Sequence, residues 1–425
     1  MLVIGDATLA DGRRRDVRVD RESGTIDAVG RQLSGSDRLD ARGRLLLPGV
    51  IDAHVHFREP GFAHKETWTT GSRSAAAGGV TTVVDQPNTD PPTVTGAAFD
   101  EKAELADASL VDWGINGGVT PDWTPEALLD RPLFALGEVF LADSTGEHGH
   151  RGRPVRDGRR ARGGRGGVPV TVHAEDATRF DETAARPGRT PTPGAPTGRP
   201  RPSWPPSSAP GRSPPTTTSR IHIAHTSTPE GVDAATAAGL TCEVTPHHLF
   251  LSRDDLDELG TFGRMNPPLR SEARREALFE RVADGTVDMI ATDHAPHTRE
   301  EKAAGVWDAP SGVPGVETAL PLLLEAARRG ELSYERVRDL TAANPAAVFD
   351  LPRKGRIEAG RDADLVLVDP DEPREIRGEA LHSSCGWTPF EGRQGVFPDW
   401  TMLRGEFAYR DGDFGDARGR NVRSA

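Results

Sequence analysis

Two histidines stand one residue apart at the end of an apolar run, in the sequence VIDAHVHF. If this run is a β-strand, side-chain alternation points His54 and His56 to the same side, where both imidazoles can bind one metal ion. His173 in VTVHAED and His225 in HIAHTS close two later runs, and Asp293 closes another in IATDHAPH. Four imidazoles and a carboxylate that converge from different strands predict a binuclear zinc site.

Apolar, β-rich runs recur along the chain, and helical segments follow several of them. The eight runs are LLLPGVIDAHVH, VTTVVDQPN, VDWGINGGVT, LFALGEVFLAD, VPVTVHAE, RIHIAHTS, LTCEVTPHH and VDMIATDHAPH. This pattern is typical of parallel strands that are buried on both faces. At least six runs carry His, Asp, Asn or Glu at or just beyond the carboxyl end, the edge where a (β/α)8 barrel places its active site. We therefore predict an α/β fold with a TIM-type (β/α)8 barrel over residues 48–349.

The two ends of the chain have a different pattern. The first 45 or so residues alternate short apolar runs with Asp-Gly and Ser-Gly turn signals, which predicts small antiparallel strands. The C-terminal segments KGRIEAGRDADLVLVDPD and WTMLRGEFAYRDGDF show the same short strands and turns. We expect residues 1–47 and 350–425 to form one small β-sandwich domain.

Composition excludes several classes of function. The chain has 425 residues, with 52 Lys and Arg against 65 Asp and Glu, so its net charge of -13 argues against a nucleic-acid partner. No signal segment opens the sequence and no apolar run approaches about 18 residues, so no membrane association is expected. Cys242 and Cys385 lie far apart and imply no disulfide framework, which favours the reducing cytoplasm.

Two stretches break the barrel pattern. Residues at about 151–167 are Arg/Gly-rich, and residues at about 185–219 are rich in Pro, Ser and Thr. Proline and glycine are the poorest helix formers, so neither stretch can supply the crossover helices that a barrel requires there. Codons for PTPGAPTG in a GC-rich gene, read one base over, can spell an ordinary helical run. We hypothesise a compensated frameshift in the gene or its recorded sequence; a genuine disordered insertion is the alternative.

Six motifs together resemble those of a known family. HVHFREPG, DQPNTDPP, VHAED, AHTSTPEG, NPPLR and ATDHAPH resemble, in order and spacing, the motifs of dihydroorotases in the amidohydrolase superfamily. The resemblance covers almost the whole chain outside the unusual stretches. It implies a barrel with a small β domain made from both chain ends, two zinc ions, and reversible hydrolysis of (S)-dihydroorotate to N-carbamoyl-L-aspartate in de novo pyrimidine (UMP) synthesis.

The resemblance also implies roles for single residues. His54, His56 and Asp293 would hold one zinc ion, and His173 and His225 the other, with a hydroxide between the two ions. Asp293 would take the proton of that hydroxide during attack and pass it to the departing ring nitrogen. Substrate would be bound by Arg58, Asn88, Asn266, His297 and the backbone around Gly312.

The ligand that would bridge the metals differs from the one in many relatives of this family, which use a carboxylated lysine on the fourth strand. This chain has no lysine between Lys102 and Lys302, so a carbamate bridge there is excluded. In GEVFLADSTG, Glu138 falls where the lysine would be, and Asp143 matches the place where other dihydroorotases use aspartate. Either carboxylate could bridge; a strand-borne side chain points into the barrel, which slightly favours Glu138.

Three alternatives remain at this level. A hydantoinase would share fold and metals, but the catalytic tyrosine of that family falls where this chain has Asp143, and Tyr334 and Tyr409 lie far downstream. An allantoinase is the second, although HFREPG, PNT and NPPLR favour a small ring with a carboxylate. The third is an inactive scaffold assembled with a transcarbamoylase, although such relatives usually lose metal histidines that this chain keeps. The expected partner is a small-molecule substrate, and assembly with further copies or with a transcarbamoylase is open.

Overall fold

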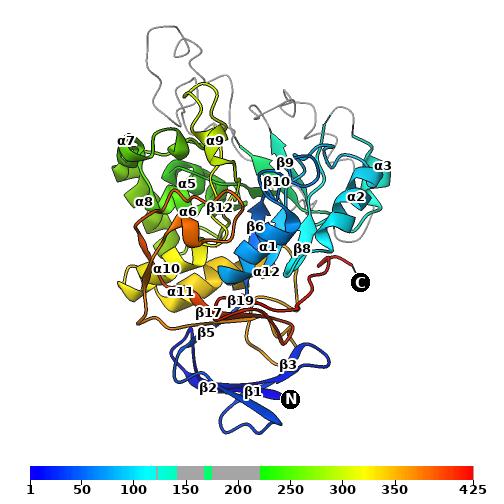
Figure 1. Ribbon diagram of the computed structural model, residues 1–425, viewed down its shortest axis with the longest axis vertical. Coiled ribbons are helices and arrows are strands. Elements are labelled where there is room, and N and C mark those ends of the chain that lie inside the picture. Colours follow the sequence, from blue (N-terminus) through cyan, green and yellow to red (C-terminus); the bar gives the residue numbers. More distant parts are fainter. Residues whose placement is uncertain (121–122, 141–166, 175–220, 425) are drawn as a thin grey trace.

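A computed structural model of the chain describes residues 1–120, 123–140, 167–174 and 221–424 (Figure 1). Asp143 lies outside the described residues, and so do the two stretches of unusual composition apart from Gly167. The fold therefore tests the barrel and the terminal β module, while the frameshift hypothesis stays a hypothesis.

The predicted barrel is confirmed. Its strands are β6 (Val50–Val55), β7 (Val80–Asp85), β8 (Asp112–Ile115), β9 (Leu136–Phe140), β10 (Val170–His173), β11 (Ile221–Ile223), β12 (Thr241–Val244) and β13 (Met289–Ile290). All neighbouring strands within the β6-β7-β8 and β9-β10-β11-β12-β13 sheets pair in parallel. Parallel bridges from Gly117 to Leu136 and from Val55 to His294 join the two sheets and close the ring. Each predicted run holds one of these strands.

Helices pack their apolar side chains against the barrel strands (Figure 1). They are α1 (Trp68–Ala77), α2 (Gly96–Ala106), α3 (Pro125–Leu129), α5 (Pro229–Ala237), α6 (Pro246–Phe250), α8 (Glu272–Ala283), α10 (Ala319–Arg328) and α11 (Tyr334–Arg338). Two further helices, α7 (Leu256–Leu259) and α12 (Asn344–Val348), belong to other apolar clusters, and the short α9 (Arg299–Lys302) has no apolar side chain. Thr67, Thr95 and Thr228 cap α1, α2 and α5 through hydrogen bonds from the first helical turn. Every residue of β6 and β7 is buried, and their apolar residues are interrupted only by Asp52 and His54 in β6 and by Thr81, Thr82 and Asp85 in β7.

Both ends of the chain contribute to one nine-stranded sheet. Its members are β1 (Leu2–Leu9), β2 (Arg14–Asp20), β3 (Thr25–Gly30), β4 (Asp37–Asp40), β5 (Leu45–Pro48), β14 (Leu365–Val368), β17 (Pro398–Leu403), β18 (Glu406–Arg410) and β19 (Asp413–Phe414). The antiparallel pair β5-β14 joins the N-terminal strands to the C-terminal strands. β1 pairs antiparallel with β2 but parallel with β4 and β5, because the chain crosses back after the β1-β2-β3 meander.

The C-terminal segment also contacts the barrel. Between β15 (Arg374–Glu375) and β16 (Gln394–Gly395), Trp387 and Phe390 are buried in a cluster with Leu322 of α10. Lys354 forms a buried ion-pair network with Asp112 of β8 and Asp364 beside β14, at 2.8 and 2.5 Å. This network links the barrel to the terminal sheet.

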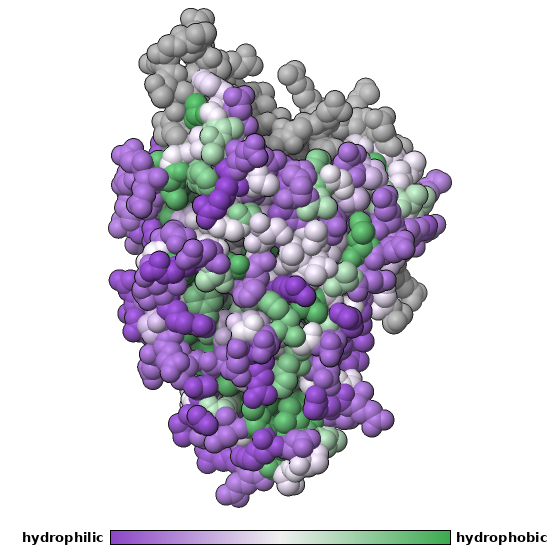
Figure 2. Space-filling view, in the orientation of Figure 1, coloured by the Kyte–Doolittle hydropathy of each residue, from purple (hydrophilic) through white to green (hydrophobic). Residues whose placement is uncertain are grey.

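The surface agrees with the acidic, polar composition. Figure 2 shows a mostly hydrophilic face, with an apolar strip toward the end of the molecule that carries β1, β2 and β3. Among the described residues, no helix is both long and apolar enough to span a membrane.

Candidate metal centre and substrate pocket

Six side chains predicted as metal ligands lie together at the carboxyl ends of barrel strands. His54 is in β6 and His56 just follows it, Glu138 is in β9, His173 ends β10, His225 follows β11 and Asp293 follows β13. All six are buried. Because parallel strands end at the same rim of a barrel, residues far apart in sequence meet here.

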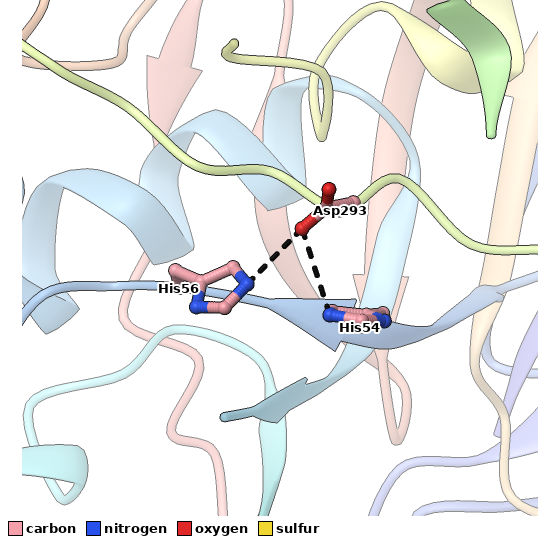
Figure 3. A group of neighbouring side chains, drawn as sticks. All are labelled: His54, His56 and Asp293. Carbon is pink, nitrogen blue, oxygen red and sulfur yellow. Dashed lines mark hydrogen bonds and ion pairs between the residues drawn. The ribbon is translucent and has the colours of Figure 1, made fainter. Parts of the chain in front are cut away.

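Asp293 faces the histidine pair of β6 (Figure 3). Its Oδ1 lies 3.0 Å from Nε2 of His56 and 3.5 Å from Nε2 of His54. One ligand atom from each of the three side chains lies within 4.8 Å of the others, a spacing that one metal ion can fill. The three residues thus form a candidate metal site.

Glu138 lies between this group and the other two histidines. Its Oε1 lies 2.8 Å from Nδ1 of His173 and also contacts Nε2 of His225. Its Oε2 lies 3.7 Å from Nε2 of His54. His54, Glu138 and His225 form a second group with ligand atoms within 4.8 Å. The carboxylate is therefore within reach of both groups, as a bridging ligand must be.

The electrostatics of the centre fit a bound cation. Burial alone disfavours a charged imidazole, yet the carboxylates of Glu243, Asp293 and Glu138 raise the pKa of His54 to about 10. Burial likewise opposes the charge of Glu138, but His225 and His173 hold its pKa well below the ordinary value. Nε2 of His54 is buried and has no hydrogen-bond partner among the described residues. A divalent ion would use this nitrogen and neutralise the surrounding carboxylates.

Behind the candidate ligands lies a buried network that sequence reasoning missed. Oε1 of Glu243 accepts from Nδ1 of His54 at 2.8 Å and from the backbone N–H of His225 at 3.2 Å. Its Oε2 is 3.1 Å from Nε2 of His222, whose Nδ1 is 2.9 Å from the Thr241 hydroxyl. Glu243 thus fixes the ring of His54 so that Nε2 faces the other ligands. The signal for it was a lone acidic residue inside the otherwise uncharged strand TCEV.

The turn after His56 is anchored from β7. The backbone N–H of Phe57 donates to Asp85 at 2.6 Å, and Lys102 forms a fully buried ion pair with the same carboxylate. The next residue, Arg58, has a left-handed backbone with φ 68. Strand alternation therefore ends before Arg58, and this turn directs its side chain into the pocket.

A pocket of about 490 Å³ opens over the centre. It is lined by His56, Glu138, His173, His225 and Asp293 at its base, and by Arg58, Lys65, Asn88, Arg264, Asn266, His297, Trp307 and Gly312 among its walls. Every predicted substrate-binding residue therefore lines it. Lys65, Arg264 and Trp307 were not predicted, because no motif marks them and the loops that carry them meet only in the fold.

Cationic and neutral donors share one side of this pocket. An Nη of Arg58 lies 3.2 Å from Nε2 of His297, and Nζ of Lys65 lies 3.2 Å from its Nδ1. Burial and the two cations hold the pKa of His297 well below its usual range, so its imidazole is neutral. Burial also lowers the pKa of Arg58 to about 10, which leaves the guanidinium charged at neutral pH. This side suits an anionic group.

The two asparagines occupy different positions. Oδ1 of Asn88 lies 2.8 Å from Nδ1 of His56, so Asn88 orients that imidazole as well as lining the pocket. Asn266 precedes a cis proline and lines the same pocket. Gly312 has φ 130, and a Cβ there would lie 2.7 Å from the Ala295 carbonyl oxygen, so only glycine fits this wall.

Two family models match the chain. The amidohydrolase family model matches residues 205–405, and the dihydro-orotase-like model matches residues 43–108. The chain is 66% identical, over an alignment of 437 residues that covers both proteins completely, to a dihydroorotase of Halobacterium salinarum. It is 43% identical to a dihydroorotase of Methanosarcina mazei over 94% of this chain and 92% of that protein.

Solved structures with the same fold include hydantoinases. The L-hydantoinase (dihydropyrimidinase) from Arthrobacter aurescens superposes with a TM-score of 0.85 at 27% identity, covering 98% of both chains. A dihydropyrimidinase from Brevibacillus agri gives a TM-score of 0.85 at 26% identity, over 99% of this chain and 98% of that chain. These likenesses support the barrel with its β-sandwich, while the far higher sequence identity lies with dihydroorotases. The chain therefore belongs to the dihydroorotase family of the amidohydrolases.

Proposed function

We propose that this chain reversibly interconverts (S)-dihydroorotate and N-carbamoyl-L-aspartate with two zinc ions per subunit. The observation that carries the proposal is the meeting of four imidazoles and two carboxylates beneath a pocket that has Arg58 and Lys65 in its wall. Such a site can activate water at one end and hold a carboxylate at the other.

For the metals, we assign His54, His56 and Asp293 to one ion, and His173 and His225 to the other, with Glu138 as the bridge. Zinc in this centre would polarise the amide carbonyl and lower the pKa of water toward neutrality. The buried, unpartnered Nε2 of His54 supports the first assignment. The contacts of Glu138 with His173, His225 and His54 support it as the bridge.

For the proton transfer, we assign Asp293. It takes a proton from the attacking water and returns it to the ring nitrogen when the amide bond breaks. Burial opposes ionisation of Asp293, but the hydrogen bond with His56 and the charge of His54 keep its pKa below the usual value. Its position at the floor of the pocket supports the role.

For substrate binding, Arg58 donates two N–H groups to the carboxylate of the ring, and Lys65 adds a second positive charge. Asn266, Asn88 and the backbone near Gly312 meet the amide groups of the ring. The neutral imidazole of His297 lies between Arg58 and Lys65: its Nδ1 accepts from Lys65, and its Nε2 donates to the Ser311 carbonyl oxygen beside the Arg58 guanidinium.

A hydantoinase is the second candidate, because the solved structures with the same fold carry that name. Tyr334 begins α11 and Tyr409 lies in β18, and neither lines the pocket. The test is turnover by the purified, zinc-loaded chain of dihydroorotate, hydantoin and allantoin, with carbamoyl aspartate for the reverse reaction. We expect dihydroorotate to be preferred. A preference for hydantoin or allantoin would overturn the substrate assignment and leave the metal centre intact.

A further inference from the structure

Lys302 is a buried lysine whose ammonium is held by backbone. It ends α9 and is completely buried. Its Nζ donates to the carbonyl oxygens of Arg264 at 2.9 Å, Pro310 at 3.0 Å and Gly312 at 3.0 Å. An ammonium has three N–H donors, and all three are used here.

This arrangement differs from the other buried lysines. Lys102 pairs with the carboxylate of Asp85, and Lys354 pairs with Asp112 and Asp364. Among the described residues no carboxylate forms an ion pair with Lys302, and Arg264 adds a like charge. Burial and Arg264 lower the pKa of Lys302 to about 7. The three carbonyl acceptors around Nζ nevertheless favour the ammonium over the neutral amine, which has only two N–H donors, and these hydrogen bonds in turn fix the backbone that supplies them.

The backbone in question is the wall of the substrate pocket. Arg264, Pro310 and Gly312 all line the pocket. They belong to two segments, one around Arg264 and one at Pro310–Gly312, which lie more than forty residues apart in sequence. The N–H of Gly312 also donates to the Arg264 carbonyl at 3.0 Å. The ammonium also lies over the Trp387 ring, 5.7 Å from its centroid, and is inaccessible to solvent. Lys302 therefore connects two loops from behind without reaching the metal centre.

We propose that Lys302 is a positioning residue for substrate binding, which ties the Arg264 segment and the Pro310–Gly312 segment into one wall that receives the dihydroorotate ring. The role rests on the proposed function. Methionine at this position would match the length of the lysine side chain but leave the buried carbonyls of Pro310 and Gly312 without a donor, and the Arg264 carbonyl with the Gly312 N–H alone. The two segments would then separate, and the substrate would lose a preformed binding surface. Because this surface contacts the ring in both the ground state and the transition state, binding would weaken equally in the two states.

The experiment compares Lys302→Met with Lys354→Met, a matched loss of a buried lysine that lies between the barrel and the terminal sheet. Steady-state kinetics on dihydroorotate, bound zinc and peptide-level hydrogen exchange are measured on both variants and on the native chain. We expect Lys302→Met to raise KM about tenfold and to leave kcat within about threefold of the native value, because the lost interactions bind the ground state and the transition state equally. Exchange should quicken in peptides that cover residues 303–313, and zinc content should stay native.

Lys354→Met should lower thermal stability and leave KM and exchange of residues 303–313 unchanged. A native KM in Lys302→Met, or an equal rise in Lys354→Met, would overturn the proposal. If Lys302→Met does not fold, Lys302→Gln, which keeps an amide donor, should give an intermediate rise in KM, and a native KM there would also overturn it. A native chain that does not turn over dihydroorotate would refute the proposed function instead, and the exchange of residues 303–313 would still decide the role of Lys302.

Discussion

Replacing Glu243 by glutamine should weaken zinc binding without unfolding the barrel. The carboxylate accepts from Nδ1 of His54 and the N–H of His225 through one oxygen, and its other oxygen faces His222. A glutamine can turn its carbonyl to His54 and His225 and its amide to His222, whose ring can change tautomer and donate to Thr241. The geometry is then kept, and only the negative charge behind His54 is lost.

The expected loss of zinc affinity in Glu243→Gln follows from the loss of that negative charge. Removing a carboxylate that orients a metal-binding histidine costs about 10- to 100-fold in metal affinity, or about 1.4 to 2.7 kcal/mol. Glu243→Ala should behave differently, because it leaves buried donors on His54, His222 and the His225 backbone unpaired and should destabilise the fold by several kcal/mol, on the order of 1–3 kcal/mol for each donor.

The assay is a zinc titration of metal-free protein in competition with a chromophoric chelator. Glu325→Gln is the matched control, because Glu325 is a buried carboxylate that pairs with Arg328 on α10, away from the pocket. We expect native zinc affinity in the control and reduced affinity in Glu243→Gln. Affinity within about twofold of native in Glu243→Gln would refute the idea that this carboxylate supports the metal centre.

Three further predictions test other parts of the account. Arg58→Lys should raise KM for dihydroorotate about 10- to 100-fold with a smaller change in kcat, because a lysine cannot bind a carboxylate through two parallel N–H groups; equal kinetics would remove Arg58 from the binding site. Glu138→Gln should lower bound zinc from two ions toward one per chain, measured by elemental analysis after dialysis, and two retained ions would exclude Glu138 as the bridge. The hydrogen bond with Glu317 raises the pKa of His382 against the opposing effects of burial and Arg73, so its stabilisation is complete below the unfolded pKa of about 6.5 and is lost as the pH rises through the raised folded pKa. His382→Gln should therefore lower the free energy of unfolding by up to about 1 kcal/mol at pH 6 and by less at pH 9, and a loss that is independent of pH in denaturant titrations would contradict this.

The barrel strands could be predicted because burial on both faces leaves a plain mark in the sequence. A continuous apolar run that ends in a polar residue encodes both the strand and the position of its ligand, as with His173 in β10 and Asp293 after β13. For the bridging ligand, the lack of a lysine in that part of the chain excludes a carbamate, and the position of Glu138 on a predicted strand slightly favours it over Asp143. The competing carboxylate, Asp143, lies outside the described residues, so the preference for Glu138 stays a prediction.

The supporting structure could not be predicted in the same way. Arg58 reaches the pocket through a left-handed backbone, which strand alternation does not anticipate. His222 and Glu243 find each other across neighbouring strands, and their pairing depends on the register of β11 against β12. Lys302 takes its partners from two loops with no periodicity, so only the fold reveals what the ammonium binds.

The most direct test of the central claim is the recovery of dihydroorotate turnover when zinc is added back to the metal-free chain. We expect no turnover without metal and a rise that levels off at two zinc ions per chain, with carbamoyl aspartate as the product. Full turnover by the metal-free chain, or a two-zinc protein that leaves dihydroorotate unchanged, would contradict it.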